Sequence, residues 1–200
     1  MVSPDLFARL GLFVDESFLD SSVCRRVVQE MRSATRKQAE VHTAEHREQV
    51  KEALRRANKV KPPAAVRSLV GERLDLLTPR LQEAFGVALS GFEPPQFLTY
   101  GSGDFHQAHT DAGSDAAAQV ARRKVSVVVF LNDQSEEPRE GSYGGGVLAL
   151  GGIIPGFGDE TRGFPIALPA GSVFAFRSDV IHEVKPVTHG ERFTIVSWFY

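Results

Sequence analysis

Short apolar runs separated by glycine and proline make up most of the chain from Gly91 onward. Runs of about four to eight residues that are rich in valine, isoleucine and phenylalanine and bounded by turn residues are typical of β-strands. Many short strands after a helical leader favour a double-sheet jelly roll with helices on one side. The expected strands are residues 97–100, 124–131, 146–150, 164–168, 172–176, 180–187 and 192–199.

The first part of the chain carries helical patterns instead. Asp20-Ser21-Ser22 is a candidate N-cap for a helix that ends near Met31. A longer helix is expected from Ala64 to about Phe85, because its apolar residues recur at helical spacing. The residues that share its apolar face are Val66, Leu69, Val70, Leu74, Leu77 and Leu81.

These patterns predict a single domain, residues 1–200, of the mainly β class with flanking helices (α+β). We expect a helical leader over about residues 1–90. A double-stranded β-helix, or jelly roll, should follow over about residues 91–200, with the N-terminal helices packed on one of its sheets. A chain of 200 residues suits one domain and can bury about 70% of its unfolded surface.

The segment from Arg32 to Pro62 is polar and dense in charge. Within it, residues 45–58 have apolar positions at helical spacing and predict an exposed helix. This helix is either an ordinary solvated element or part of a lid or partner surface. The sequence alone does not assign a role to this segment.

Composition excludes several classes of protein. The formal net charge of −2 gives no general attraction to nucleic acid. No run approaches about 18 consecutive apolar residues, so no membrane span is expected. The N-terminus lacks a secretory apolar core, and Cys24 is the only cysteine, so no internal disulfide can form. A cytoplasmic protein is expected.

Three side chains form a candidate metal site, namely His109, Asp111 and His182. In a strand, residues i and i+2 point the same way, so His109 and Asp111 can approach one ion together. The third ligand must come from a distant strand, and His182 lies in such a run. Two imidazoles and one carboxylate can occupy one face of an octahedral Fe(II) and leave the other face open.

Arg192 follows His182 by ten residues and begins the last apolar run. At a strand period of two, Arg192, Thr194, Val196 and Trp198 share one face, whereas Phe193, Ile195 and Phe199 share the other. A charge on such a strand is costly unless it meets an anion. Two histidines and one carboxylate are typical of non-heme iron oxygenases, and these enzymes usually take electrons from 2-oxoglutarate. The far carboxylate of 2-oxoglutarate suits the planar and permanently charged arginine.

An ordered set of motifs resembles a known family, the 2-oxoglutarate- and Fe(II)-dependent dioxygenases of the prolyl 4-hydroxylase type. The resemblance covers about residues 92–200, roughly half of the chain. The motifs are Tyr100-Gly101-x-Gly103-x-Phe105-x-x-x-His109-x-Asp111, Phe130-Leu131-Asn132, Gly145-Gly146-x-Leu148, Pro169-x-x-Gly171-x-x-x-x-Phe176 and His182-x-Val184-x-Pro186-Val187-x-x-Gly190-x-Arg192-x-x-x-x-x-Trp198.

The resemblance implies a role for each site residue. His109, Asp111 and His182 would bind Fe(II), Arg192 would bind 2-oxoglutarate, and Tyr100 and Trp198 would line the co-substrate pocket. Dioxygen would be the second co-substrate, with ascorbate as a candidate reductant. One departure concerns the position just before Phe130, where animal oxygen-sensing relatives have a tyrosine and this chain has Val129.

The expected reaction is hydroxylation of a C–H bond with release of succinate and carbon dioxide. The resemblance favours a prolyl residue of a protein or peptide, and a free amino acid or another small metabolite is the alternative. A non-catalytic, cupin-like metal- or ligand-binding barrel is a further alternative, against which Arg192 argues. The sequence does not determine the oligomeric state.

Several other histidines, a basic cluster and two long connections are further candidates for functional features. His106 should point to the opposite strand face from His109. We interpret it as loop surface, with a place next to the metal ligands or facing the substrate as the alternative. His42 and His46 share a helical face but lack the glutamate of a zincin motif. Residues 122–124 form a basic cluster that is typical of a solvated strand entry. Residues 133–145 and 151–163 are long connections that could be either lids or surface loops.

Overall fold

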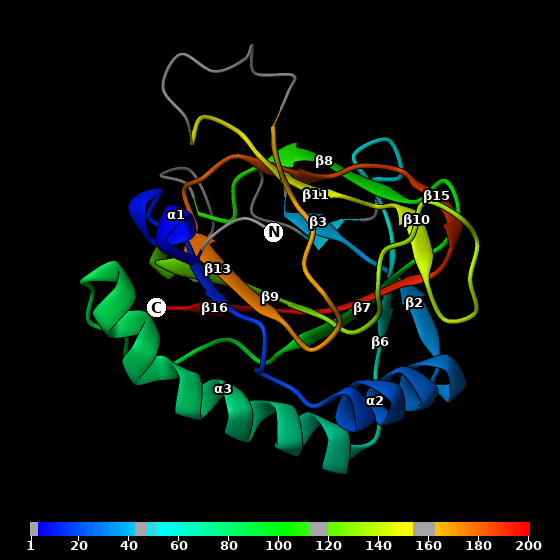
Figure 1. The fold of residues 1–200 in the computed structure, drawn as a ribbon, viewed down its shortest axis with the longest axis horizontal. Helices are drawn as coiled ribbons and strands as arrows, with labels where there is room; N and C mark the ends of the chain where they lie inside the picture. Colours follow the sequence, from blue (N-terminus) through cyan, green and yellow to red (C-terminus); the bar gives the residue numbers. More distant parts are fainter. Residues whose placement is uncertain (1–3, 43–47, 50, 113–119, 154–162) are drawn as a thin grey trace.

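Two antiparallel β-sheets face each other in the computed structural model, which describes residues 4–42, 48–49, 51–112, 120–153 and 163–200 (Figure 1). The larger sheet has seven strands in the order β1-β13-β9-β16-β7-β6-β2. Their bounds are Phe13–Asp15 (β1), Arg36–Gln38 (β2), Asn58–Val60 (β6), Gln96–Tyr100 (β7), Val125–Phe130 (β9), Val173–Arg177 (β13) and Arg192–Phe199 (β16).

The smaller sheet has five strands in the order β12-β11-β14-β8-β5. Their bounds are Arg55–Arg56 (β5), Phe105–His109 (β8), Leu148–Leu150 (β11), Phe164–Ile166 (β12) and His182–Val184 (β14). Two further strand pairs join Tyr143–Gly145 (β10) to Val187–Gly190 (β15) and Val41–His42 (β3) to Glu48–Gln49 (β4).

The described part of the chain has three α-helices, which lie before most of the strands in the sequence. They are Pro4–Arg9 (α1), Ser21–Ser33 (α2) and Ala64–Phe85 (α3), and a 3-10 helix spans Val120–Arg122 (η1). The predicted helix over residues 64–85 is confirmed, and it ends at Gly86 in the left-handed conformation that glycine favours. Among the described residues, no helix has the length and apolar character needed to cross a membrane.

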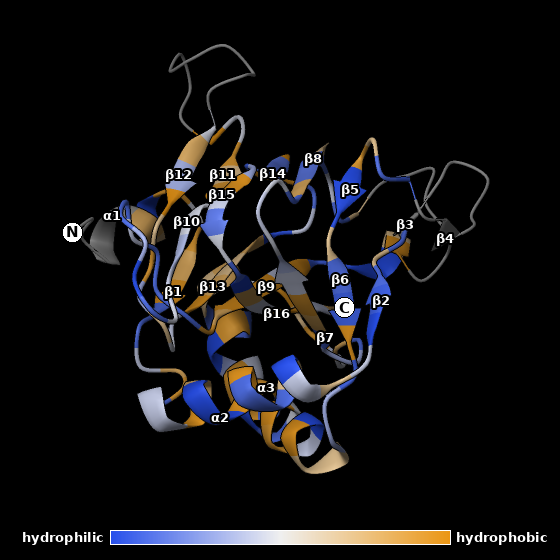
Figure 2. Cartoon of the chain, turned by 90° about the vertical axis from the view of Figure 1, so that its right-hand side faces the viewer, coloured by the Kyte–Doolittle hydropathy of each residue, from blue (hydrophilic) through white to orange (hydrophobic). Residues whose placement is uncertain are grey.

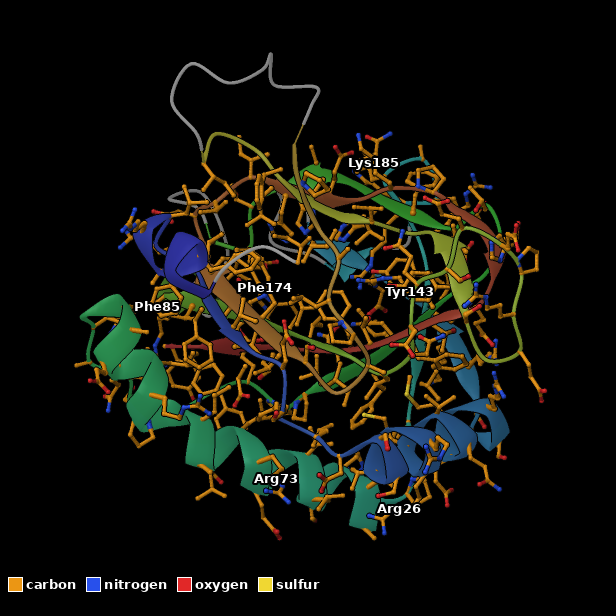
Figure 3. The ribbon with its side chains drawn as sticks, in the orientation of Figure 1. Arg26, Arg73, Phe85, Tyr143, Phe174 and Lys185 are labelled. Carbon is orange, nitrogen blue, oxygen red and sulfur yellow. The ribbon has the colours of Figure 1, made fainter. Side chains whose placement is uncertain are left out.

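The apolar residues form two clusters, one on each face of the larger sheet. One cluster lies between the two sheets and includes Phe130 and Phe174 of the larger sheet and Leu148 and Val184 of the smaller. Figure 3 labels Phe174 among the side chains of this layer. The other joins the opposite face of the larger sheet to residues of α2 and α3, including Val27, Leu74 and Leu81. Figure 2 shows these helices beneath the hydrophobic strands β9 and β13.

Strand β16 has the alternation that its sequence predicts. Phe193, Ile195 and Phe199 belong to the cluster on the helix side of the larger sheet. Arg192, Thr194, Val196 and Trp198 face a cavity between the sheets. Because alternate residues of a strand point to opposite faces, one strand both completes the helix-side core and supplies a wall of the cavity.

The prediction for residues 45–58 is wrong where the structure describes them. In place of an exposed helix, this part of the leader contains β4, β5 and the start of β6. Strand β5 pairs with β8, and β6 pairs with β7, so the segment extends both sheets. Strands β5 and β6 are largely hydrophilic (Figure 2). Their pairing depends on backbone hydrogen bonds rather than on an apolar pattern.

Candidate metal centre and adjoining cavity

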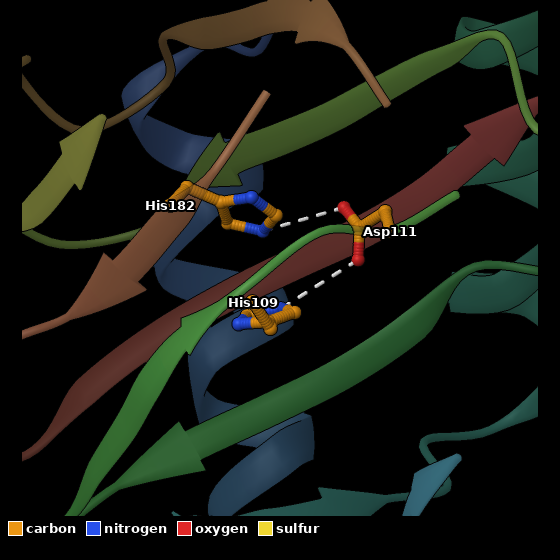
Figure 4. A group of neighbouring side chains, drawn as sticks. All are labelled: His109, Asp111 and His182. Atoms are coloured by element: carbon orange, nitrogen blue, oxygen red, sulfur yellow. Dashed lines mark ion pairs between the residues drawn. The ribbon is translucent and has the colours of Figure 1, made fainter. Parts of the chain in front are cut away.

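His109, Asp111 and His182 come together between the two sheets (Figure 4). His109 ends β8, His182 begins β14, and the two residues are direct partners in the pairing of these strands. Asp111 follows β8 by two residues, and its backbone N–H donates to the Ser178 carbonyl at 2.9 Å. The three candidate ligand atoms all lie within 4.8 Å of one another, so they can share one ion.

Hydrogen bonds hold both imidazoles in the orientation that metal binding requires. The Nδ1 atom of His109 lies 2.8 Å from the Gln107 carbonyl oxygen, and that of His182 lies 3.0 Å from the Val180 carbonyl oxygen. Each Nδ1–H donates to a carbonyl, which leaves Nε2 as the ligating atom. The two Nε2 atoms lie 3.7 and 3.4 Å from the Asp111 carboxylate oxygens.

The Asp111 carboxylate is also positioned by serine hydroxyls. Ser126 donates its hydroxyl to Asp111 Oδ2 at 2.7 Å, and its oxygen lies 2.9 Å from that of Ser178. Ser126 lies on the cavity face of β9, whose neighbouring residues Val125 and Val127 face the helices. The sequence analysis did not identify either serine, although Ser126 interrupts an otherwise apolar strand.

Local electrostatics keep Asp111 and His182 in their metal-binding protonation states. Burial opposes ionisation of Asp111, but His182 and His109 outweigh this effect, with help from the Ser126 hydrogen bond, and hold its pKa below the usual value. Burial lowers the pKa of His182, although Asp111 opposes the shift. A neutral imidazole and an ionised carboxylate are the ligating forms of these side chains. Two histidines and one carboxylate around an open position fit Fe(II).

Arg192 is the largest fully buried side chain among the described residues and is 1% exposed. Its Nη1 donates to the Thr194 hydroxyl at 3.2 Å, whereas Nε and Nη2 have no partner in the described part of the chain. The guanidinium carbon lies 5.3 Å from the Tyr100 ring centre and 5.9 Å from that of Tyr143. A buried arginine with two unused donors fits a carboxylate of a bound co-substrate.

One cavity of about 220 Å³ contains the candidate metal centre and Arg192. Tyr100 and Trp198 both line it, and their role in binding a co-substrate stays a prediction. Tyr143, which the sequence analysis missed, lies close to Arg192 together with Tyr100 and Phe130. Its position just before the glycines of the Gly145-Gly146 motif is the sequence signal that could have identified it.

The glycines of this motif are required because the backbone comes close to Arg192. Gly146 has φ of 58°, and a Cβ atom there would lie 3.0 Å from the Arg192 Cδ atom. At Gly145, a Cβ atom would lie 2.4 Å from the Pro186 carbonyl oxygen. Only glycine is compatible with both the left-handed backbone and the available space.

The prediction that His106 faces away from the site is wrong. Its ring stacks on that of His109, with 3.7 Å between the ring centres, and it lines the cavity. The pairing of β8 with β14 shifts register, so that His109 pairs with His182 and His106 with Val184. This irregularity places two residues that are three apart on the same face, as a β-bulge does.

Arg123 is not part of a solvated basic cluster. Only 8% of it is exposed, and it binds both carboxylate oxygens of buried Glu93, at 2.6 and 2.7 Å. Its Nη1 donates to the Asp111 carbonyl at 3.3 Å, and its guanidinium lies 3.9 Å from the Trp198 ring centre. The residue therefore belongs to the wall of the cavity.

The Val129 position does not line the pocket. Val129 is fully buried in the cluster on the helix side of the larger sheet, whereas Phe130 lies 5.6 Å from the Arg192 guanidinium on the opposite face. The departure from the family pattern at Val129 therefore does not touch the co-substrate site. His46 and the side chain of His42 lie outside the described residues, as does most of the connection at 151–163.

A family model described as the 2OG-Fe(II) oxygenase superfamily matches residues 95–200, which include all of the candidate ligands and Arg192. The chain belongs to this superfamily. Fe(II), 2-oxoglutarate and dioxygen are the cofactor and co-substrates that membership implies. The donor set of the candidate metal centre and the unused donors of Arg192 fit the first two of these groups.

Two curated relatives of the chain are named as PKHD-type hydroxylases. A PKHD-type hydroxylase of Hyphomonas neptunium is 36% identical over 120 residues, which are 58% of this chain and 46% of the relative. A PKHD-type hydroxylase of Maricaulis maris is 31% identical over 137 residues, or 64% of this chain and 55% of the relative. The chain spans about half the length of the curated relatives it matches.

Solved structures match nearly the whole chain. A prolyl-4-hydroxylase of Pseudomonas putida is 25% identical, with a TM-score of 0.71 over 98% of this chain and 95% of that one. A prolyl hydroxylase of Trichoplax adhaerens, solved with a peptide of the hypoxia inducible factor, is 19% identical and has a TM-score of 0.73 over 98% and 88% of the chains. The chain therefore has the jelly-roll fold of those structures.

Proposed function

We propose that this chain is an Fe(II)- and 2-oxoglutarate-dependent dioxygenase that hydroxylates a prolyl residue of a protein or peptide and releases succinate and carbon dioxide. The observation that carries the proposal is one cavity containing both a two-histidine, one-carboxylate cluster and a buried arginine with two unused donors. A metal-binding barrel without a co-substrate has no need of such an arginine.

Each residue has a defined part in this proposal. His109, Asp111 and His182 hold Fe(II), and Arg192 binds the far carboxylate of 2-oxoglutarate. Tyr100 and Trp198 line the co-substrate pocket and exclude water from it. When bound, the iron would activate dioxygen, which oxidises both 2-oxoglutarate and the substrate, so that a hydroxyl group replaces a hydrogen on carbon.

The protein's own groups hold the site ready for these ligands. Ser126 fixes one Asp111 oxygen, and the Gln107 and Val180 carbonyls fix the imidazoles, so that little reorganisation accompanies metal binding. The guanidinium of Arg192 is held between Thr194 and aromatic rings before 2-oxoglutarate arrives. Such preorganisation favours binding because the ligand need not order the side chains.

The substrate assignment rests on similarity. The Pseudomonas putida structure is that of a prolyl-4-hydroxylase, and the Trichoplax adhaerens enzyme was solved with a peptide. Leu54 is 40% exposed although it lines the cavity, so it offers an apolar surface on which a pyrrolidine ring could pack. These observations support a prolyl peptide as the substrate.

The first test is succinate formation from 2-oxoglutarate by protein that is loaded anaerobically with Fe(II) and then exposed to air. The matched control is Asp111→Ala, which removes one ligand. We expect slow uncoupled turnover in the wild type and none in the variant. Proline-containing peptides should then raise the rate and gain one oxygen atom by mass spectrometry. If the wild type neither formed succinate nor bound 2-oxoglutarate, the proposal would be contradicted and a non-catalytic barrel would be favoured.

A further inference from the structure

Arg55 is a second buried guanidinium in the wall of the same cavity. It lies in β5 and is 7% exposed. Its Nη1 donates to the Glu40 backbone carbonyl at 2.9 Å, whereas its buried Nε has no partner among the described residues. No described carboxylate forms an ion pair with it. A buried charge without a counter-ion is strongly destabilising, so such a group usually serves a ligand.

The other charges of the cavity wall are already matched. Lys59 pairs with the Glu40 carboxylate at 3.3 Å, and Arg123 pairs with Glu93. Asp111 is engaged by the metal-site histidines and Ser126. In the proposed function, 2-oxoglutarate neutralises Arg192. Of the described cationic side chains that line the cavity, Arg55 is therefore the one left without an anion.

Arg55 lies close to the metal centre. It is the direct partner of His106 in the pairing of β5 with β8, and the His106 ring stacks on that of the candidate ligand His109. Leu54, the preceding residue, lines the same cavity and is partly exposed. The cationic side chain of Arg55 and the apolar side chain of Leu54 therefore both lie beside the candidate metal centre.

We propose that Arg55 binds a carboxylate of the substrate, so that the preferred substrate is acidic close to the carbon that is hydroxylated. The inference rests on the proposed function, because it assigns the substrate class of the same cavity. The carboxylate has two possible sources. One is an aspartate or glutamate side chain next to a prolyl residue, and the other is the α-carboxylate of a terminal or free proline.

Arg56 provides a matched control for Arg55. It carries the same charge and lies in the same strand, but it is exposed and its guanidinium lies 4.9 Å from the Phe105 ring centre. Neighbouring residues of a strand point to opposite faces, and Arg56 does not line the cavity. Arg56→Gln therefore removes one positive charge without changing the proposed carboxylate site.

The test measures binding without turnover. Wild-type protein is saturated with 2-oxoglutarate and with Zn(II), which has no redox chemistry, so that Arg192 is already occupied. Fluorescence of Trp198, the single tryptophan and a lining residue of the cavity, reports binding. Two probe pairs differ only in one carboxylate. They are acetyl-Glu-Pro-amide with acetyl-Gln-Pro-amide, and N-acetylproline with N-acetylprolinamide.

We expect the acid of one pair to bind about ten- to a hundred-fold more tightly than its amide, the range for hydrogen bonds to charged groups. The pair that shows the preference identifies the source of the carboxylate. Arg55→Gln should abolish the preference, Arg55→Lys should retain part of it, and Arg56→Gln should retain all of it.

The inference is overturned if the wild type binds acid and amide equally in both pairs, or binds neither, whether or not Arg55→Gln folds. It is also overturned if a preference persists in Arg55→Gln. Failure of the proposed function looks different, because the wild type would then neither bind 2-oxoglutarate nor form succinate. If the wild type forms succinate but binds acid and amide equally, the inference is wrong and the proposed function stands.

Discussion

Replacing Arg192 with methionine should abolish stabilisation of the protein by 2-oxoglutarate. Two donors of Arg192, Nε and Nη2, have no partner in the described part of the chain and are available to one carboxylate. Hydrogen bonds to charged groups contribute about 1.5–3 kcal/mol each. Loss of two such bonds predicts a weakening of 2-oxoglutarate binding by roughly 10²- to 10⁴-fold.

This weakening converts into a measurable change in thermal stability. At a 2-oxoglutarate concentration of about 100 times the wild-type Kd, the ligand adds about 2.7 kcal/mol to the free energy of unfolding. For a domain of this size, that corresponds to a rise in Tm of about 5–11 °C. In Arg192→Met the same concentration is at or below the Kd, so the gain is about 0.4 kcal/mol or less.

Thermal unfolding of the Zn(II)-loaded proteins, with and without 2-oxoglutarate, measures both quantities without catalysis. Arg192→Lys is the informative control, because it keeps the charge but offers no planar pair of donors, and it should show an intermediate gain. If Arg192→Met retained the full rise in Tm, the co-substrate carboxylate would have to bind elsewhere in the cavity. The assignment of Arg192 would then be wrong.

Three other changes test separate parts of the structure. Ser126→Ala removes the hydroxyl that fixes Asp111 and should weaken Zn(II) binding by about 10- to 100-fold, measured by competition with a chelator. Gly146→Ala places a methyl group against Arg192 on a left-handed backbone and should lower both the free energy of unfolding, by about 1–3 kcal/mol, and 2-oxoglutarate affinity. Burial raises the pKa of Cys24 from 9.0 to about 11. The thiol ionises at lower pH in the unfolded chain than in the folded protein. Its contribution to stability is therefore complete below pH 9 and is lost as the pH rises to about 11. The free energy of unfolding of the wild type relative to Cys24→Ala, from urea titrations, should therefore fall by about 2–3 kcal/mol over that interval.

The features that the sequence predicted depend on local patterns. Strand β16 was predictable because burial on both faces imposes a period of two on its residues, including Arg192 and Trp198. The triad was predictable because the spacing of His109 and Asp111 suits one strand end. Helix α3 was predictable because its apolar face is wide and its end is marked by Gly86.

The features that it missed depend on partners distant in the sequence. Strand β5 has only two residues, both arginine, and forms because the edge of β8 is available to it. His106 faces the site because a register shift between β8 and β14 overrides simple alternation. Arg123 is buried because Glu93, on another segment, neutralises it. Neither periodicity nor charge patterning contains this information.

Two of the strands contributed by the leader should also protect the molecule from self-association. Strand β6 covers the backbone edge of β7, and β5 covers that of β8, while α2 and α3 cover the apolar face of the larger sheet. A fragment limited to residues 95–200, the extent of the family match, would expose both edges and that face. Unpaired edges are templates for aggregation, so the leader should be needed for a soluble monomer even though the candidate metal ligands lie outside it.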